Sequence, residues 1–168
     1  MNDLIQALPI LIVLVLMLAP FFIVVSALFP KRVLKTQGNI DLMPGRSFTV
    51  GLVNFLFFFT IAFVLFILAD KTDGFLKALL TIPAALIAAL LVIALGLGLA
   101  GVVNLIGERV FPAQPAWRRT LWGTCLLGIA CGLPVVGWFL VLPYAGWMGM
   151  GALILGFFQP ERPALPRE

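Results

Sequence analysis

Histidine is missing from this 168-residue sequence, and charged residues are scarce. Without histidine, the chain lacks the commonest zinc ligand, the usual axial ligand of haem and the most frequent general base. Charged side chains make up 11% of the residues and hydrophobic ones 62%, whereas soluble domains average about 25% charged residues. Because so few charges cannot cover a surface in water, the composition predicts a protein that resides in a lipid bilayer.

Cysteine is rare as well. Cys125 and Cys131 lie in an apolar run and match neither a metal-binding spacing nor a Cys-x-x-Cys redox motif, so we interpret them as small apolar side chains. No charged residue lies near the middle of an apolar run, where ion pathways and proton relays usually need one. With no nucleophile beside a base and no metal cluster, the sequence predicts a non-enzymatic protein without catalytic or metal-ligating residues.

Long apolar runs separated by short polar segments dominate the chain. A membrane span needs about 20 apolar residues, so the pattern predicts an all-α, polytopic transmembrane helical bundle of about four spans, forming a single domain over 1–168. The predicted spans are 4–29, 48–69, 83–106 and 120–142, followed by a helical segment at 144–158 and an irregular tail at 159–168.

The last apolar run must break. As one helix, Thr120 to Phe158 would reach roughly 58 Å, about twice the hydrocarbon thickness of a bilayer. Pro134 and Pro143 are the natural break points. One interpretation is a span to about Leu142 followed by a helix at the interface; the other is a helical hairpin that turns near Pro134.

Several short signals predict helix ends. Pro44 and Gly45 indicate a turn within the polar segment 30–47, and Ser47 is a candidate N-cap of the second span. Thr72 or Asp73 is a candidate N-cap of the third helix. Pro83 suits the first turn of the third span, where its missing N–H costs nothing.

Basic residues concentrate in two of the polar segments. The first holds Lys31, Arg32, Lys35 and Arg46, and a second lies over 107–119. Placing both in the cytoplasm gives seven basic residues inside against two outside, so the positive-inside rule predicts a bacterial inner-membrane protein with its N-terminus outside. A terminal hairpin would raise the inside count to nine. Basic residues in short loops indicate topology rather than nucleic-acid binding, and four together could attract anionic lipid.

Small residues four apart predict close helix packing. Residues 96–101 fit the GxGxxG pattern, but they lie deep in an apolar run with no strand before them, which excludes a nucleotide-binding turn. Small residues on one helix face instead let backbones approach closely. The pairs are Ala94 with Gly98, Gly96 with Ala100, and Gly128 with Gly132.

Two asparagines are the clearest polar residues within the spans. Antiparallel helices would place Asn54 and Asn104 near the same, cytoplasmic face, where an Asn–Asn or Asn–backbone hydrogen bond could join helices. The second span is also rich in phenylalanine, which indicates lipid contact and packing. Apolar contact with a quinone or a pigment remains open, although without histidine the chain should ligate no cofactor directly.

Short motifs along the chain resemble a known family. They are Phe29-Pro30-Lys31-Arg32, Pro44-Gly45-Arg46-Ser47 with Gly51, Leu133-Pro134-Val135-Val136-Gly137-Trp138, and Gly149-Met150-Gly151-Ala152-Leu153. Over nearly its whole length the chain resembles the small bacterial membrane module found in, or appended to, bactofilin-like or polymer-forming cytoskeletal proteins. The resemblance implies a membrane scaffold and no catalytic residues; the polar β-solenoid of bactofilins is absent from the sequence.

Small size, short loops and close-packing faces lead to three hypotheses of function. The first is a non-enzymatic accessory or structural subunit of a larger membrane complex, of respiratory or photosynthetic type, whose partners are other integral membrane subunits and lipids. The second is a membrane anchor for a cytoskeletal or envelope-shaping protein, acting through the basic segment. The third is a small transporter or channel for an apolar solute.

Overall fold

The computed structural model describes residues 2–132 and 136–158, with side chains from Val15 onward, and contains no strand in these ranges. The all-α fold predicted from the apolar runs is therefore confirmed. The elements are α1 (Asn2–Leu28), α2 (Pro30–Leu42), α3 (Pro44–Asp70), α4 (Phe75–Val110), α5 (Ala116–Cys131), the π-helical turn η1 (Gly137–Val141) and α6 (Leu142–Phe158). The predicted irregular tail at 159–168 lies outside the described residues.

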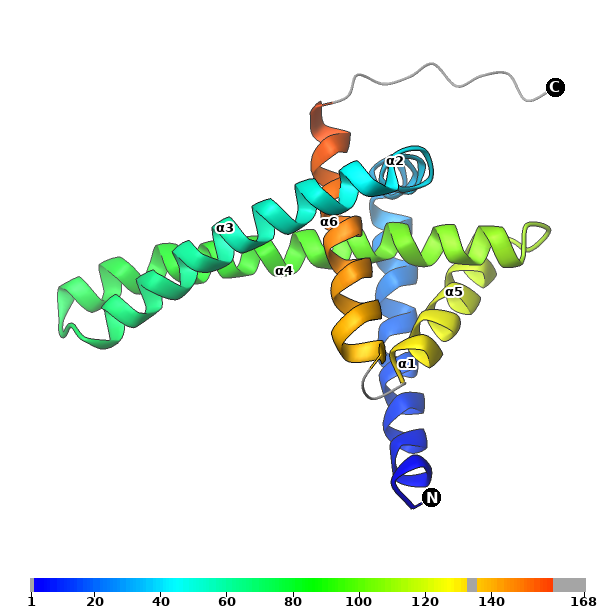
Figure 1. The fold of residues 1–168 in the computed structure, drawn as a ribbon, viewed down its shortest axis with the longest axis horizontal. Coiled ribbons are helices and arrows are strands. Elements are labelled where there is room, and N and C mark those ends of the chain that lie inside the picture. Colours follow the sequence, from blue (N-terminus) through cyan, green and yellow to red (C-terminus); the bar gives the residue numbers. More distant parts are fainter. Residues whose placement is uncertain (1, 133–135, 159–168) are drawn as a thin grey trace.

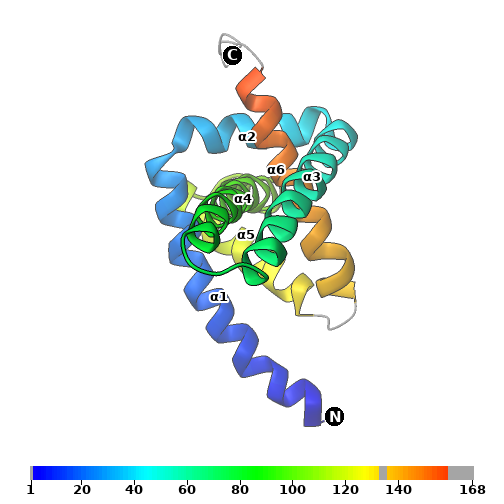
Figure 2. The same cartoon turned by 90° about the vertical axis from the view of Figure 1, so that its left-hand side faces the viewer.

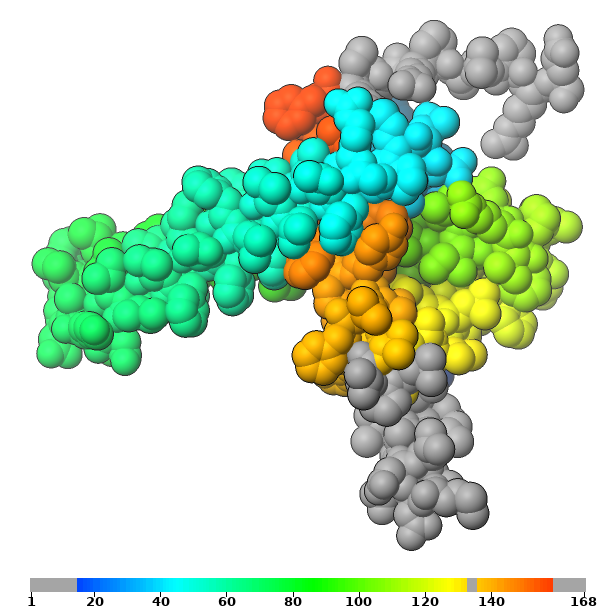
Figure 3. All heavy atoms as spheres, in the orientation of Figure 1, coloured from blue at the N-terminus to red at the C-terminus, as the bar shows by residue number. Residues whose placement is uncertain are grey.

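An antiparallel hairpin of α3 and α4 projects from the rest of the molecule (Figure 1). The body consists of α1, α2, α5, α6 and the C-terminal part of α4, and both α1 and α6 cross α4 (Figures 1 and 2). We call residues 56–90 the arm. The space-filling view shows the arm projecting from the body (Figure 3).

Among the described residues, three helical stretches have the length and apolarity to cross a membrane: α3, α4 and the joined η1–α6 segment, Gly137–Phe158. A fourth is obtained if α1 and α2 are one broken span, since they meet at a bend of 104°. Several long apolar helices thus agree with the predicted membrane protein of about four spans.

The polar segment 30–47, predicted to be a loop, is mostly the amphipathic helix α2. Pro30 occupies the first turn of α2, where a proline is tolerated. Val33, Gln37 and Ile40 recur at helical spacing and are buried, whereas Lys31 and Arg32 are exposed. The prediction was wrong because one buried face every three to four residues suffices for a helix, even where the mean hydropathy is low.

The helix ends also differ from the prediction. Because α3 already begins at Pro44, Ser47 is not an N-cap; its buried hydroxyl donates to the carbonyl oxygen of Asn39 at 3.4 Å. Gly74, which alone among the described residues has positive φ (64°), precedes α4, while Thr72 donates backwards to the carbonyls that end α3. Pro83 lies inside α4, since the helix starts two turns before it.

The predicted span over 120–142 is not one helix. α5 ends at Cys131, and the chain resumes as a helix at Gly137 and runs in the opposite direction through α6, in which Pro143 is an internal residue (Figure 1). The end of α6 lies beside α2, since the Arg32 guanidinium lies 4.1 Å from the centre of the Phe157 ring. This arrangement matches the hairpin alternative, although Pro134 lies outside the described residues.

Candidate functional site

The small residues of the two predicted pairs in α4 have different neighbours. A Cβ built on Gly98 would overlap the backbone of Gly149 in α6, so these two helices touch backbone to backbone. Gly96 faces the ring of Phe21 in α1, and Ala100 is fully buried in a cluster with Val103. Ala94, in contrast, is only half-buried.

The third predicted pair, Gly128 with Gly132, is divided between two roles. A Cβ on Gly128 would overlap the side chain of Val15, so this glycine makes room for α1. Gly132 lies just past the end of α5, where its N–H donates to the carbonyl of Gly128 at 2.8 Å. Gly132 therefore ends α5, whereas Gly128 allows α1 to pack closely against α5.

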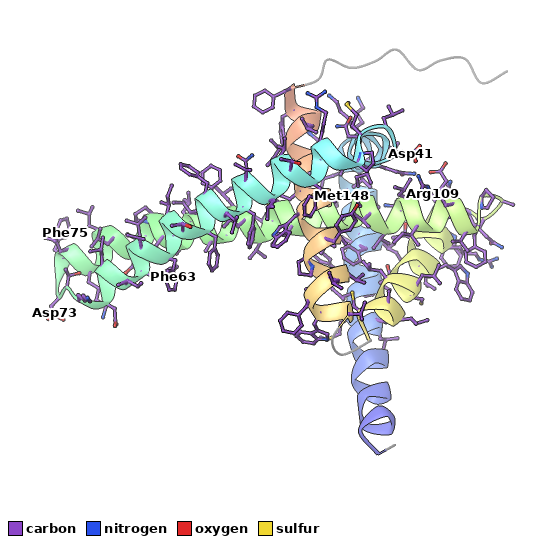
Figure 4. The ribbon with its side chains drawn as sticks, viewed as in Figure 1. Asp41, Phe63, Asp73, Phe75, Arg109 and Met148 are labelled. Atoms are coloured by element: carbon purple, nitrogen blue, oxygen red, sulfur yellow. The ribbon has the colours of Figure 1, made fainter. Side chains whose placement is uncertain are left out.

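The closest crossings involve glycines outside the three predicted pairs. Gly51 of α3 meets Gly151 of α6, and Met148 lies where α6 crosses the hairpin (Figure 4). Gly107 and Gly123 likewise join α4 to α5. The signal that could have found Gly51 was the Ser47-x-x-x-Gly51 spacing, which repeats the small-residue pattern that had been recognised in α4.

The two asparagines do not bond to each other. Asn54 donates to the carbonyl of Val50 in its own helix at 2.8 Å, as an isolated polar group in an apolar helix does. Asn104 donates to the carbonyl of Ala100 at 2.9 Å and also reaches a second helix. The predicted Asn–Asn bond is thus wrong, because each amide is satisfied elsewhere.

Asn104 is the centre of a network that joins three helices. Its Nδ2 donates to Ser26 Oγ of α1 at 2.8 Å, and its Oδ1 accepts from Thr120 Oγ1 of α5 at 2.6 Å. Both polar atoms of the amide are therefore bonded across helix boundaries. Thr124 extends the network along α5 by donating to the carbonyl of Thr120 at 2.8 Å.

A charged rim lies next to this network. The Gln37 amide of α2 donates to Glu108 Oε2 of α4, and the other oxygen, Oε1, lies 3.7 Å from Arg119 Nη1 of α5. Farther out, Arg109 of α4 pairs with Asp41 of α2, as Figure 4 shows. The rim brings the two predicted basic segments to one end of the body.

The four residues of the predicted basic loop occupy helices. Lys31 and Arg32 are exposed on the outer face of α2, and Arg46 is exposed in the first turn of α3. Lys35 is half-buried, with its aliphatic stem near Gly156 of α6, and has an interaction of its own. The basic segment therefore presents three exposed cationic side chains rather than four.

A pocket of about 390 Å³ opens over the Asn104 network, between α1, α2, α4 and α5. We call it the junction pocket. Its walls are mainly apolar, with the polar side chains of the Asn104 network and of the charged rim among them. It is lined by Ile23, Ser26, Ala27, Pro30, Val33, Leu34, Gln37, Asn104, Glu108, Ala116, Trp117, Arg119 and Thr120.

A second, apolar depression of about 440 Å³ follows the contact between α1 and α5. We call it the α1–α5 groove. Ile23 lines both the groove and the junction pocket, so the two adjoin. The groove is lined by Val15, Leu16, Ala19, Pro20, Ile23, Leu121, Cys125 and Ile129.

The chemistry available at this junction is recognition by hydrogen bonds and charge. The part of the chain that the structure describes holds no group of three or more histidine, cysteine or acidic side chains close enough to bind a metal ion. No protein-family model, curated protein or solved structure matches the chain. The resemblance to the bactofilin-associated membrane module consequently stays a prediction.

Proposed function

We propose that this chain is a non-enzymatic accessory or structural subunit of a larger assembly in the bacterial inner membrane, with its N-terminus outside. The observation that carries the proposal is the arm. Its two helices bury only small side chains, namely Ala62, Ala69 and Ala84, and leave bulky apolar residues on the remaining faces. Such a surface offers neighbouring helices a large area for van der Waals packing.

The exposed residues of the arm are aromatic and branched aliphatic side chains. Phe57, Phe63 and Leu86 are each more than half exposed. Charged residues appear only at the far tip, where Asp73 lies beside Phe75 (Figure 4). A long apolar surface that ends in a polar turn is typical of a helix pair that is embedded in a membrane and packs against other proteins there.

The polar side chains of the body support a structural role. Asn104, Thr120 and Ser26 bond to one another and tie α1, α4 and α5 together. Interhelical bonds of this kind stabilise a membrane bundle by about 0.6 kcal/mol on average. The orientation is supported by the ion pair between Arg109 and Asp41, which joins the two segments that the positive-inside rule assigns to the cytoplasm.

Site-specific photocrosslinking in intact cells would test the proposal. A photoreactive residue at Phe63 or Leu86, on the arm, should crosslink to another membrane protein. Leu42 is a matched control, since it is 63% exposed but lies on α2 in the body, away from the arm. Mass spectrometry of the crosslinked band would identify the partner. Crosslinks to lipid alone at both arm positions would contradict the proposal.

A second candidate function has its own supporting observation, the exposed cations of α2. Lys31 and Arg32 are exposed on α2, a helix that lies across the end of the body (Figure 2). Such a face fits an acidic surface of a cytoskeletal or envelope-shaping protein. Lys31→Glu with Arg32→Glu should then release proteins that co-purify with the wild-type chain, and retention of those proteins would exclude this mode of binding.

A further inference from the structure

We propose that the junction pocket and the α1–α5 groove together bind one glycerophospholipid with an amine headgroup. In this arrangement, Arg119 pairs with the phosphodiester, Glu108 pairs with the ammonium group, and one acyl chain lies in the groove. The inference requires the chain to be in a membrane but does not depend on its being an accessory subunit.

The two depressions differ in polarity in the same way as the headgroup and the acyl chains of a lipid. The lining of the junction pocket includes hydrogen-bonding and charged groups, whereas the groove is lined by apolar side chains and the Cys125 thiol. Ile23 belongs to both and marks the boundary. A single molecule that occupies both must therefore have a polar head directly joined to an apolar chain.

The groove has room for part of an acyl chain. Along α1 it extends from Ile23 back to Val15, which corresponds to about 12 Å at the 1.5 Å rise of an α-helix. Because Ile23, at one end of this stretch, also lines the junction pocket, an acyl chain can enter the groove directly from the head site.

The charges in the pocket select a zwitterion. Its lining contains one cation, Arg119, and one anion, Glu108, so its formal charge is zero. Their closest atoms are 3.7 Å apart, which is a loose pair, and both side chains are partly exposed. A guanidinium forms strong, directional hydrogen bonds with phosphate, and a carboxylate accepts from an ammonium group. An anionic headgroup would leave Glu108 facing a like charge.

Neutral hydrogen-bonding groups complete the head site. Ser26 Oγ accepts from Asn104, which leaves its own hydroxyl proton to donate to a phosphate or ester oxygen. Gln37 fixes one oxygen of Glu108 and leaves the other directed toward Arg119. An uncharged quinone ring would instead cover two charged groups without offering either an opposite charge, which is unfavourable.

Lipid titration monitored by native mass spectrometry would test the proposal. The full chain, purified and delipidated in a mild detergent, is titrated separately with phosphatidylethanolamine, phosphatidylglycerol, diacylglycerol and an isoprenoid quinone. We expect phosphatidylethanolamine to bind most tightly. Arg119→Gln and Glu108→Gln should each weaken it about tenfold or more, since each removes a charge-assisted bond. Arg46→Gln is the matched control, because Arg46 is exposed, lies in α3 and does not line the pocket, and it should leave binding unchanged.

The native thiol in the groove provides an independent readout. In a Cys131→Ala background, bound phosphatidylethanolamine should slow the reaction of Cys125 with a maleimide, and Arg119→Gln should remove this protection. Circular dichroism would verify that each variant keeps its helicity, and Arg119→Lys, which retains the charge, should keep part of the binding. Equal binding of diacylglycerol, phosphatidylglycerol or quinone would overturn the proposal. So would equal effects of Arg119→Gln and Arg46→Gln, or no protection of Cys125.

Discussion

Gly51 of α3 and Gly151 of α6 face each other so closely that neither could carry a side chain. A Cβ built on Gly151 would lie 2.5 Å from the backbone nitrogen of Gly51, and one built on Gly51 would lie 2.8 Å from that of Gly151. This crossing lies at the base of the arm, where α3 leaves the body (Figure 1). It therefore determines how the arm is attached.

Alanine at position 51 should destabilise the fold. The added methyl group would overlap the carbonyl oxygen of Trp147, which is backbone and cannot move aside without shifting α6. We expect Gly51→Ala to lower the free energy of unfolding by about 1–3 kcal/mol, the usual cost of overpacking. Denaturation of the purified protein in mixed micelles, followed by circular dichroism, would measure the change.

Gly38→Ala is the control for this substitution. Gly38 lies in α2, and a Cβ added to it would have no atom of another residue within 4 Å, so the methyl group meets open space. Replacing a helical glycine by alanine without a clash should stabilise the protein by about 0.5–1 kcal/mol. Equal unfolding free energies for the two variants would show that the α3–α6 crossing can widen without cost.

Removing the side-chain amide should destabilise the protein more at Asn104 than at Asn54. Asn104→Ala breaks bonds to Ser26 and Thr120 on two other helices, so we expect a loss of about 0.6–1.7 kcal/mol. Asn54→Ala removes only a bond within α3 and should change stability far less. The same micellar unfolding experiment compares them, and a double-mutant cycle of Asn104→Ala with Thr120→Val would isolate the coupling.

The ion pair between Asp41 and Arg109 should contribute little to stability. Both side chains are more than half exposed, and such pairs typically contribute about 0–1 kcal/mol. Asp41→Asn should therefore lower stability slightly at low salt and not at all at high salt. The exchange of both charges, Asp41→Arg with Arg109→Asp, should restore the salt-dependent part. A large loss that persists at high salt would mean that the pair is shielded from water.

Cysteine labelling should place the ends of the helices on defined sides of the membrane. Single cysteines at Leu42, Phe75 and Phe158, each exposed, are introduced after Cys125 and Cys131 are replaced by alanine. α3 is 27 residues long, or about 40 Å, so its two ends should lie on opposite sides of a bilayer about 30 Å thick.

An impermeant maleimide should then label positions 42 and 158 from the same side and position 75 from the other. The common side for 42 and 158 follows from the contact between Arg32 and Phe157. By the positive-inside rule, that side should be the cytoplasm. Labelling of position 158 together with 75 would contradict the terminal hairpin.

Much of the architecture could be predicted because its causes are local. The apolar runs between charged turns are visible in the sequence, and they predicted α1, α3 and α4 to within a few residues at most ends. The break in the last run followed from its length alone. The helix α2 was missed because its apolar positions are only a few and lie in a segment rich in charge.

The partners of the small and polar residues could not be predicted from the sequence. Spacing showed that Gly98 has room for a neighbour, but not that the neighbour is Gly149 of α6. It placed Asn104 near a membrane face, but not beside Ser26 and Thr120. The pocket over this network forms where two consecutive helices, α1 and α2, meet two others, α4 and α5, that come much later in the chain.

The sequence by itself determined that this protein is helical and embedded in a membrane, since composition and hydropathy set the solvent that each segment prefers. Only the tertiary structure decided which helices meet, where the chain reverses and how the junction pocket forms. Lipid is as apolar as the helices, so burial does not select their pairing. The pairing depends instead on short-range backbone contacts and hydrogen bonds, such as those of Gly51 with Gly151 and of Asn104 with Thr120.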